Sequence, residues 1–482
     1  MNKINRHIRR LLAGISAALL ILSFPPFSMW PLAWIAFCPL FLAALDCPDA
    51  KSAANLGGFT GLLFYGISLH WLLKIFGPVA LAFWCVFALW LALHITLLWK
   101  IWNNELLGNA VRLKRILFVA AAGLLWTGIE YFRCEIWWLE CSWLALGYSQ
   151  TPAASLFQTC GLLGIYGLSA LIVSVNAALF LSLKERRAAP AISAVLFLSI
   201  LSLWGGRRTH AFPAEQGRKI SVALVQDESY NLDRLSALSL GEETKNADLL
   251  IWPEYSFPIQ PGQDEIYLNL LRKKLKGSRS TAIIGAAVFH DEFKKNRMKN
   301  FAWIISPEGK LLGRYDKLHP IPYVEKRLQP GNRNLIPNPS PEPIPTPAGI
   351  LGMQICYDLD FENGSRKMAN LGAQIITVNN LDPVSWGKWQ HFQHSNMSPA
   401  RAVETGLWLV RSASSGYSQI IDPLGRIRSS MPMESSGVLT GTAYLLVAGT
   451  FYSKHGWVFA PLCCLLTLLA LIACSGLFRV RD

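Results

Sequence analysis

The sequence predicts a bundle of about eight membrane-spanning helices joined to an α/β domain outside the membrane. Of its 482 residues, 52% are hydrophobic and only 16% are charged, which is too apolar a composition for one soluble globule. Long apolar segments fill the first 206 residues and return near the end. Between them, short β-branched runs alternate with helical stretches, a pattern typical of an α/β domain.

Each long apolar segment approaches the ~20 residues that an α-helix needs to cross a bilayer. The basic stretch Met1–Arg10 precedes the first of them, and no small-residue cleavage site follows, so we expect an uncleaved first helix. We assign helices one to seven to residues 1–206, the α/β domain to 207–450 and the eighth helix to 451–482. The eight expected helices are 8–24, 28–46, 54–75, 78–102, 116–133, 155–183, 189–205 and 455–478.

Lysines and arginines are distributed unevenly over the connecting segments. With the N-terminus inside, the inside segments hold fourteen of them, whereas the short outside loops before the seventh helix hold only Arg133. Basic loops stay on the cytoplasmic side, so we expect the α/β domain on the outer side, which in a bacterium is the periplasmic side of the inner membrane. This placement accounts for much of the net charge of +14, and no basic stripe with interleaved aromatics indicates nucleic-acid binding.

Nine of the ten cysteines lie in or beside apolar segments. Cys134 and Cys141 share one loop, and a disulfide between them stays open at this stage. The tenth, Cys356, has no other cysteine between about residues 207 and 450 and therefore no disulfide partner in its own domain. It is either a buried small hydrophobe or a nucleophile.

The residues at three strand ends favour the nucleophile. Cys356 ends the run GILGMQIC, Glu254 follows the run ADLLIW, and Lys317 follows a short strand in GRYDKLHPIPYVE. Acyl transfer through a thiol needs a nucleophile, a base and a cation that stabilises the oxyanion, which these three side chains supply. Their ordinary alternatives are a buried thiol, a surface carboxylate and a solvated lysine.

Three further residues are candidates for supporting roles. Glu325, eight residues after Lys317, is expected to orient Lys317 or the acceptor of the acyl group, unless it belongs to a surface cluster with neighbouring basic residues. Tyr357 and Asp358 either take part in the reaction or only hold the nucleophile turn. His391 and His394 form an HxxH pattern without a third ligand, so we expect no metal and no cofactor.

The remaining runs of the α/β domain predict its other elements. Helices are expected at 266–276 and 361–371, and the proline-rich segment 336–347 is expected to be a loop. Besides those already quoted, the expected strands are KISVALVQ, TAIIGAAVF, NFAWIIS, AQIITVNN, LWLVRSA and YSQIIDP.

The α/β domain resembles the nitrilase, or carbon–nitrogen hydrolase, superfamily, on the evidence of Glu254, Lys317 in YDK and Cys356 in CYD. That resemblance implies an αββα sandwich. The whole chain resembles the apolipoprotein N-acyltransferases, through its helix layout and through FPPFSMWPLAW, WLALGYSQ, GIYGLSALIVSVN, WQHFQ and RAVE. Asp358 stands where that family usually has Glu, and no Trp precedes Trp252 in the segment after VALVQ.

The resemblance implies an acyltransferase that uses a phospholipid as acyl donor and a thioester on Cys356 as intermediate. The acceptor would be the α-amine of a diacylglyceryl-modified N-terminal cysteine on an apolipoprotein. Two alternatives stay open: a membrane-anchored amidase acting on a small amide, favoured by Asp358 and the missing Trp, and a non-enzymatic transporter or scaffold. The sequence leaves the oligomeric state open, and a monomer is the expectation.

Overall fold

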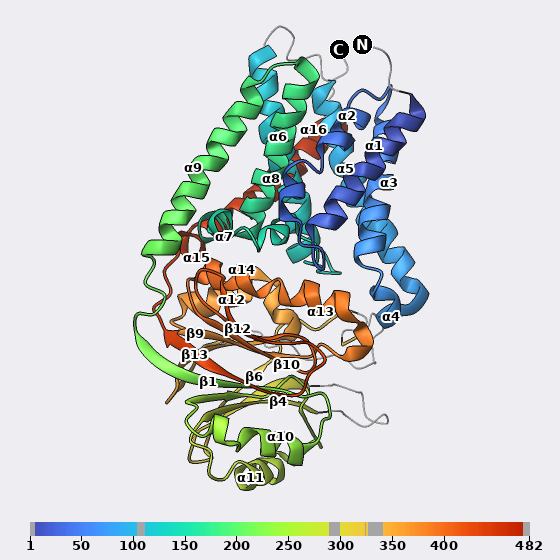
Figure 1. The fold of residues 1–482 in the computed structure, drawn as a ribbon. Helices are drawn as coiled ribbons and strands as arrows, with labels where there is room; N and C mark the ends of the chain where they lie inside the picture. Colours follow the sequence, from blue (N-terminus) through green and yellow to red (C-terminus); the bar gives the residue numbers. More distant parts are fainter. Residues whose placement is uncertain (1–4, 104–110, 289–298, 323, 326–340, 476–482) are drawn as a thin grey trace. The chain divides into compact units, whose positions relative to one another are not determined.

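The computed structural model describes residues 5–103, 111–288, 299–322, 324–325 and 341–475. The chain divides into two compact units (Figure 1). The helical unit comes from Met1–Ala211 and His455–Asp482, and the α/β unit is Phe212–Lys454. Helices of apolar residues form the first unit, and strands with shorter amphipathic helices form the second.

Several helices of the helical unit are long and apolar. Within the described residues, five stretches have the length and composition to cross a membrane: Leu72–Trp102, Arg112–Ile136, Cys160–Glu185, Ala189–Ala211 and Gly456–Cys474. The predicted membrane helical domain is confirmed, whereas the count of eight spans stays a prediction. The α-helices are α1 (Arg6–Ser23), α2 (Cys38–Ala44), α3 (Ala50–Ser68), α4 (Leu72–Phe76), α5 (Ala80–Trp102), α6 (Val111–Tyr131), α7 (Ala154–Phe157), α8 (Cys160–Glu185), α9 (Ala189–Ala211) and α16 (Phe459–Ser475).

The second predicted helix, 28–46, is wrong as a continuous element. The structure has a 3₁₀ turn, η1 (Trp30–Trp34), followed by the short helix α2. Each has a proline as its second residue, Pro31 and Pro39, and a proline fits the first turn of a helix but not its interior. The seventh helix, in contrast, continues past the predicted end at residue 205 to Ala211.

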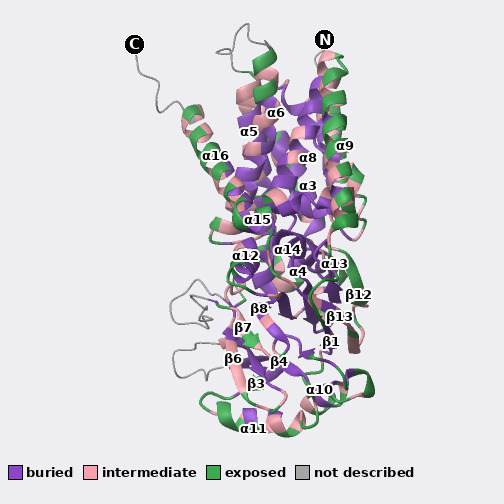
Figure 2. Ribbon diagram, turned by 90° about the vertical axis from the view of Figure 1, so that its left-hand side faces the viewer, coloured by how far each residue is buried: buried purple, intermediate pink, exposed green. Residues whose placement is uncertain are grey.

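Close packing inside the helical unit depends on small residues. A Cβ atom at Gly61 of α3 would lie 2.8 Å from Cα of Ala88 on α5, so only glycine permits this approach. Figure 2 shows that α9 and α16 differ from the inner helices because exposed residues run along much of their length. Cys134 and Cys141, for which a disulfide was an open alternative, are both thiols.

The α/β unit is an αββα sandwich, as the resemblance implied (Figure 1). One sheet has the order β13-β1-β2-β4-β5-β6, with β3 paired to β4, and the other has the order β12-β11-β10-β9-β8-β7. The strands of the first sheet are β1 (Arg218–Gln226), β2 (Leu249–Ile251), β3 (Phe257–Ile259), β4 (Thr281–Val288), β5 (Lys299–Ile305), β6 (Leu311–Asp316) and β13 (Gly437–Leu445). Those of the second are β7 (Ile344–Thr346), β8 (Gly349–Ile355), β9 (Ile375–Asn380), β10 (Leu409–Ala413), β11 (Ser418–Ile421) and β12 (Ile427–Met431).

Alternation along the strands builds two apolar layers. In β1, Ile220 and Val222 belong to the cluster that also holds Leu351 and Ile355 of the second sheet, so they face the space between the sheets. Ala223 and Val225 point the other way, into the cluster with Leu235, Leu268 and Leu271. Successive side chains of a strand point to opposite faces, so a single apolar run supplies both layers.

Helices cover both outer faces of the sandwich (Figure 1). The helices α10 (Leu232–Ser239) and α11 (Asp264–Lys274) cover the first sheet, and α12 (Glu362–Asn370), α13 (Lys388–Ser395) and α14 (Ser398–Thr405) cover the second. The unit ends in the short helix α15 (Phe451–Lys454). The helices expected at 266–276 and 361–371 are α11 and α12. The loop expected at 336–347 is wrong at Ile344–Thr346, where β7 pairs antiparallel with β8, and 336–340 lie outside the described residues.

Strand direction places two of the predicted site residues at one edge of the first sheet. β2 runs parallel to β4, and two antiparallel pairings, β4 with β5 and β5 with β6, return β6 to the same direction. The carboxyl ends of β2 and β6 therefore meet at one edge. Glu254 follows the end of β2, and Lys317 follows the end of β6 directly.

Candidate active site

Lys317 lies buried between two carboxylates. Its Nζ is 2.9 Å from Oε1 of Glu254 and 2.8 Å from Oε2 of Glu325. The exposed fractions of the side chains are 0% for Lys317, 1% for Glu254 and 4% for Glu325. Charges are buried at this depth only when they are paired and hydrogen-bonded, and here each member of the group contacts another.

Two neutral side chains complete this buried group. Asn300, at the start of β5, donates from Nδ2 to Oε1 of Glu254 at 2.5 Å and to Oε1 of Glu325 at 3.0 Å. The backbone carbonyl oxygen of Asn300 also accepts from the backbone N–H of Lys317 at 2.9 Å, which fixes the two residues side by side. The hydroxyl of Tyr255 donates to Oε1 of Glu325 at 2.5 Å.

The chain turns sharply next to Glu254, and a glycine makes room for the turn. A Cβ atom at Gly285 of β4 would lie 2.1 Å from the carbonyl oxygen of Pro253 and 2.8 Å from Cα of Glu254. The backbone of this turn therefore rests directly on β4. Tyr255 adopts the left-handed conformation, with φ of +59°, on the other side of Glu254.

Cys356 occupies a strained position at the end of β8. It begins the short turn η6 (Cys356–Asp360) with φ of +48°. Residues other than glycine, asparagine and aspartate rarely adopt this left-handed backbone conformation. Its exposed fraction is 2%, and its Sγ lies 3.7 Å from the carbonyl oxygen of Leu381. Strained backbone of this kind is concentrated at functional sites, and a sharp strand-to-helix turn presents nucleophiles in other enzymes.

Asp358 ties the turn that carries Cys356 to the segment that carries Lys317. Its Oδ1 accepts from the backbone N–H groups of Leu318 at 3.0 Å and His319 at 2.6 Å. Its Oδ2 accepts from the N–H of Ile355 and from the hydroxyl of Tyr315, both at 3.0 Å. Three of these bonds reach across to β6 and the segment after it, and the bond from Ile355 closes the turn itself, so Asp358 acts on the position of Cys356 and Lys317 together.

Tyr357 packs among aromatic rings behind the turn. Its ring meets that of Phe361 edge-on, with centroids 5.0 Å apart, and Phe361 in turn stacks on His319 at 4.1 Å. The exposed fraction of Tyr357 is 7%. The residue after Cys356 is thereby held in the apolar packing of the turn.

Burial and neighbouring charges set the protonation states of the site. Burial raises the pKa of the Cys356 thiol well above its usual range; Glu254 raises it further, and Lys317 lowers it. Burial also raises the pKa of Glu254, against the lowering effect of Lys317. Burial lowers the pKa of Lys317, but the carboxylates of Glu254 and Glu325 outweigh it and hold that pKa well above its usual range. The resting site therefore combines a thiol and an ammonium with a carboxyl group able to exchange protons.

A second buried ionic group lies behind the loop that contacts Cys356. His394 Nδ1 is 2.6 Å from Oδ1 of Asp382, and His394 Nε2 is 3.3 Å from Oδ1 of Asp360. Nη2 of Arg411 lies 2.6 Å from Oδ2 of the same Asp382. Asp360 ends the turn of Cys356, and Asp382 follows Leu381, whose carbonyl oxygen contacts Sγ of Cys356. His394 therefore connects the turn that carries the thiol with the loop that contacts it. The other histidine of the HxxH pattern, His391, contacts the carbonyl oxygen of Pro383 at 3.0 Å.

The structure brings the predicted residues into one neighbourhood through these contacts. Glu254, Lys317 and Glu325 contact one another, and Glu254 and Lys317 both act electrostatically on Cys356. Sequence reasoning missed Asn300 and Tyr255. Asn300 is the first polar side chain inside a run otherwise of strand type, and Tyr255 follows Glu254 directly, so both carried a weak signal.

Two family models cover most of the chain. The model described as apolipoprotein N-acyltransferase N-terminal domain matches residues 16–178, and the carbon–nitrogen hydrolase model matches residues 217–447. The chain is 30% identical to the apolipoprotein N-acyltransferase of Geobacter metallireducens, over 94% of this chain and 92% of that protein. The chain belongs to the apolipoprotein N-acyltransferase family. It is also 28% identical to the apolipoprotein N-acyltransferase of Pseudomonas putida, over 96% of each chain.

Membership of the apolipoprotein N-acyltransferase family makes this chain an acyltransferase and a membrane protein. A likeness to a solved structure, the nitrilase-superfamily member Nit3 of Saccharomyces cerevisiae, covers 47% of this chain and 90% of that one, with 19% identity and a TM-score of 0.38. The family model on the α/β unit agrees with the sandwich described above. The small-amide alternative is not favoured, because the match to the family continues through the membrane helices.

Proposed function

We propose that this protein transfers a fatty acyl chain from a membrane phospholipid to the α-amine of a diacylglyceryl-modified N-terminal cysteine on a bacterial apolipoprotein. The main support is the buried contact of Lys317 with Glu254 and Glu325 next to the strained turn of Cys356. Family membership and the apolar helices support lipid-derived substrates. The proposed catalytic residues are Cys356 as nucleophile, Glu254 as general base and acid, and Lys317 as oxyanion-stabilising cation.

The first half-reaction loads the enzyme. Glu254 takes the proton from Sγ of Cys356, and the thiolate attacks the ester carbonyl carbon of the phospholipid. The new C–S bond forms as the negative charge moves to the carbonyl oxygen, which Lys317 stabilises. The C–O bond then breaks, and Glu254 returns its proton to the leaving oxygen, which releases a lysophospholipid. The raised pKa of Glu254 suits a group that must both accept and donate this proton.

The second half-reaction unloads the enzyme. The amine of the acceptor attacks the thioester carbon, a C–N bond forms, and the C–S bond breaks. Glu254 takes a proton from the attacking nitrogen and passes it to the departing sulfur of Cys356. The sum of both steps moves one acyl group from oxygen to nitrogen and needs no oxidant, reductant or cofactor.

The burial of the site favours transfer over hydrolysis. A thioester reacts with water as well as with an amine, so the amine wins only where water has little access. Cys356 and Lys317 have exposed fractions of 2% and 0%. We expect the acyl chain and the acceptor to complete this shielding when they bind.

The supporting residues act on the geometry of the catalytic ones. Glu325 holds Nζ of Lys317 against Glu254, and Asp358 holds the turn of Cys356 against the segment after β6. Tyr357 packs the turn from behind. All three are proposed as positioning residues.

The topology follows from the basic loops. We place membrane helices in 1–206 and 451–482, and the catalytic domain 207–450 on the periplasmic side of the inner membrane. A catalytic domain on that side meets lipoproteins whose modified N-termini lie in the outer leaflet of the same membrane. The expected working form is a monomer, because one chain supplies every residue of the proposed mechanism.

A transfer assay tests this function. Full-length protein in detergent receives a phospholipid with a labelled acyl chain and a synthetic diacylglyceryl lipopeptide with a free amine. We expect labelled amide from the wild type, none from Cys356→Ala, and unchanged transfer by the matched control Cys85→Ala, whose cysteine is exposed on α5. Ammonia release from simple amides without acyl transfer would instead favour an amidase and refute the proposal.

A further inference from the structure

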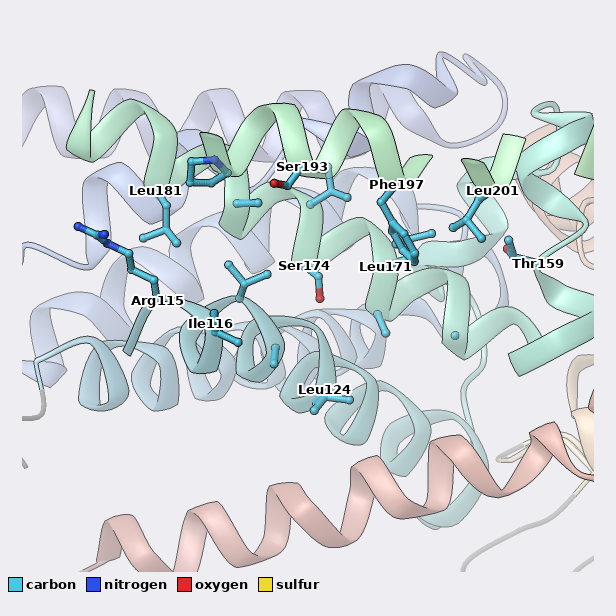
Figure 3. Close-up of a pocket in the computed structure, with 18 of the residues that line it drawn as sticks. Arg115, Ile116, Leu124, Thr159, Leu171, Ser174, Leu181, Ser193, Phe197 and Leu201 are labelled. Atoms are coloured by element: carbon cyan, nitrogen blue, oxygen red, sulfur yellow. The ribbon is translucent and has the colours of Figure 1, made fainter. Parts of the chain in front are cut away.

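The helical unit contains an apolar groove of about 990 Å³ between α6, α8 and α9 (Figure 3). Its volume reaches the upper end of the ~300–1,000 Å³ typical of small-molecule sites. Helix α8 is kinked at Gly164, and beyond the kink its lining residues run from Gly167 to Leu181, roughly 21 Å of helix at ~1.5 Å per residue. This stretch alone covers about two thirds of the ~30 Å hydrocarbon layer of a bilayer.

Small side chains on the facing helices create this groove. Ala170, Ser174 and Ala178 line it from α8, and Ser193 and Ala194 line it from α9. In the membrane-length window of α9, only 6% of residues are buried inside the protein. Helix α9 contacts its neighbours closely near both ends: the N–H of Ala191 donates to Oγ of Ser182 on α8 at 2.8 Å, and a Cβ atom at Gly205 would lie 1.9 Å from the carbonyl oxygen of Ser155.

A groove of this size does not stay empty in a membrane. Protein interiors are packed to the density of organic crystals, and a void of this volume would forfeit the contacts of every side chain around it. The lining is largely leucine, isoleucine, alanine and phenylalanine, which offers water few polar partners. Lipid tails are the apolar material that surrounds these helices.

One end of the groove carries positive charge. Arg112 and Arg115, in the first turns of α6, line this end, and Figure 3 shows Arg115 beside Leu181. Nε of Arg115 lies 2.6 Å from Oε1 of Glu185. Arg186 and Arg187 follow Glu185 directly and are exposed. Among the described residues at the start of α6 and the end of α8, arginines therefore outnumber carboxylates.

We propose that this groove binds an anionic phospholipid, with the phosphate at Arg112 and Arg115 and the acyl tails along α8 and α9. The positive guanidinium of arginine is complementary to a phosphate diester in charge and in hydrogen-bonding geometry. Every lining residue belongs to the helical unit and none is a proposed catalytic residue, so we propose a bound lipid in addition to the acyl donor that reacts at Cys356. The inference rests on the membrane insertion of the helices and not on the proposed catalytic residues.

Native mass spectrometry tests this site. Full-length Cys356→Ala protein, which cannot consume a donor lipid, is purified in detergent and offered phosphatidylglycerol and phosphatidylethanolamine in equal amounts. We expect one retained phosphatidylglycerol per chain, and roughly a tenfold or greater loss of its occupancy in Arg112→Gln/Arg115→Gln, because both charge-assisted contacts with the phosphate are removed. Lys51→Gln, which removes an exposed cation elsewhere in the unit, is the control and should retain the lipid.

A second pair of variants tests the tail-binding part without changing charge. Ser193→Phe puts a ring into the groove and should lower lipid occupancy, whereas Ile192→Phe places the same ring on the next residue, which does not line the groove. Equal occupancy in all variants, or equal retention of the two head groups, would overturn the proposal. Because the measurement reads bound lipid in an inactive protein, its failure leaves the transfer reaction untouched, and loss of transfer activity leaves this site untouched.

Discussion

Nζ of Lys317 lies 2.9 Å from Oε1 of Glu254, and the exposed fractions of these side chains are 0% and 1%. The ammonium is thus a fixed part of the site and does not need to be recruited by the substrate. A cation held in place before the reaction stabilises the developing oxyanion without reorganisation. The same contact also makes each partner dependent on the other for stability.

Lys317→Met is predicted to lower the transfer rate by roughly a hundredfold to a thousandfold, the usual loss for one oxyanion-stabilising donor. It should also destabilise the fold by about 3–5 kcal/mol, because Glu254 and Glu325 would be left buried without their cation. Rates must therefore be normalised to folded protein, measured by circular dichroism. Lys310→Met, at an exposed lysine before β6, should change neither quantity, and wild-type transfer rates in Lys317→Met would exclude the proposed role.

Tyr255→Phe is predicted to weaken catalysis while the protein stays folded. The substitution removes the hydroxyl that donates to Glu325 at 2.5 Å and leaves the ring in place. Loss of one hydrogen bond to a charged group is worth about 1.5–3 kcal/mol, so a rate loss of about tenfold or more is expected. Steady-state transfer kinetics check this, with Tyr267→Phe on α11 as the matched control. An unchanged rate would mean that Glu325 does not depend on this bond.

Asp358→Asn is predicted to reduce both stability and transfer. Four groups donate to the two carboxylate oxygens, and an amide replaces one acceptor by a donor that would face an N–H or O–H group. A buried group left without a partner costs about 1–3 kcal/mol, so we expect a lower thermal midpoint of the full-length protein. The exposed Asp264 provides the control Asp264→Asn, and equal midpoints for both variants would contradict the structural role of Asp358.

His394 is predicted to make stability depend on pH at the alkaline end. Burial lowers its pKa, but the carboxylates of Asp382 and Asp360 outweigh burial and raise the pKa from 6.5 to about 9. The folded state therefore binds the proton more tightly than the unfolded state. This stabilisation, on the order of 3 kcal/mol, is complete below about pH 6.5 and is lost as pH rises through about 9.

Thermal unfolding of the wild type and His394→Gln between about pH 6 and pH 9.5 measures this effect. The wild-type midpoint should fall more steeply than that of the variant as pH rises. His210→Gln, at an exposed position in the last turn of α9, is the control and should follow the wild type. Parallel curves for wild type and His394→Gln would show that His394 carries no such proton.

The sequence predicted the site best where a reactive side chain directly follows an apolar run of strand type. Cys356, Glu254 and Lys317 each follow an apolar run, and the direction of those runs brings Glu254 and Lys317 to one edge. The partnership of Asn300 with Lys317 depends on the register of β5 against β6, which shifts at an irregularity between Ile304 and Ile305 that the apolar runs do not reveal. The apolar runs do not reveal the contacts of His394 either, because its carboxylate partners come from two other segments of the chain.

The membrane part was predictable in outline for a different reason. Apolar length alone identifies helices such as α5 and α8, because a bilayer imposes it. The break between η1 and α2 shows where that argument stops. Pro31 and Pro39 lie in the first turns of new elements inside an apolar stretch. A hydropathy profile does not show the backbone hydrogen bonds that these prolines remove.

The most direct test of the central claim is the mass of the intact protein after incubation with phospholipid but without an acceptor. We predict a mass increase of one fatty-acyl group on Cys356, located by proteolysis, removed by hydroxylamine and lost when the lipopeptide amine is added. Glu254→Gln should acquire the adduct far more slowly. Amide product formed with no acylated Cys356 at any time, or formed equally by Cys356→Ala, would contradict the thioester mechanism.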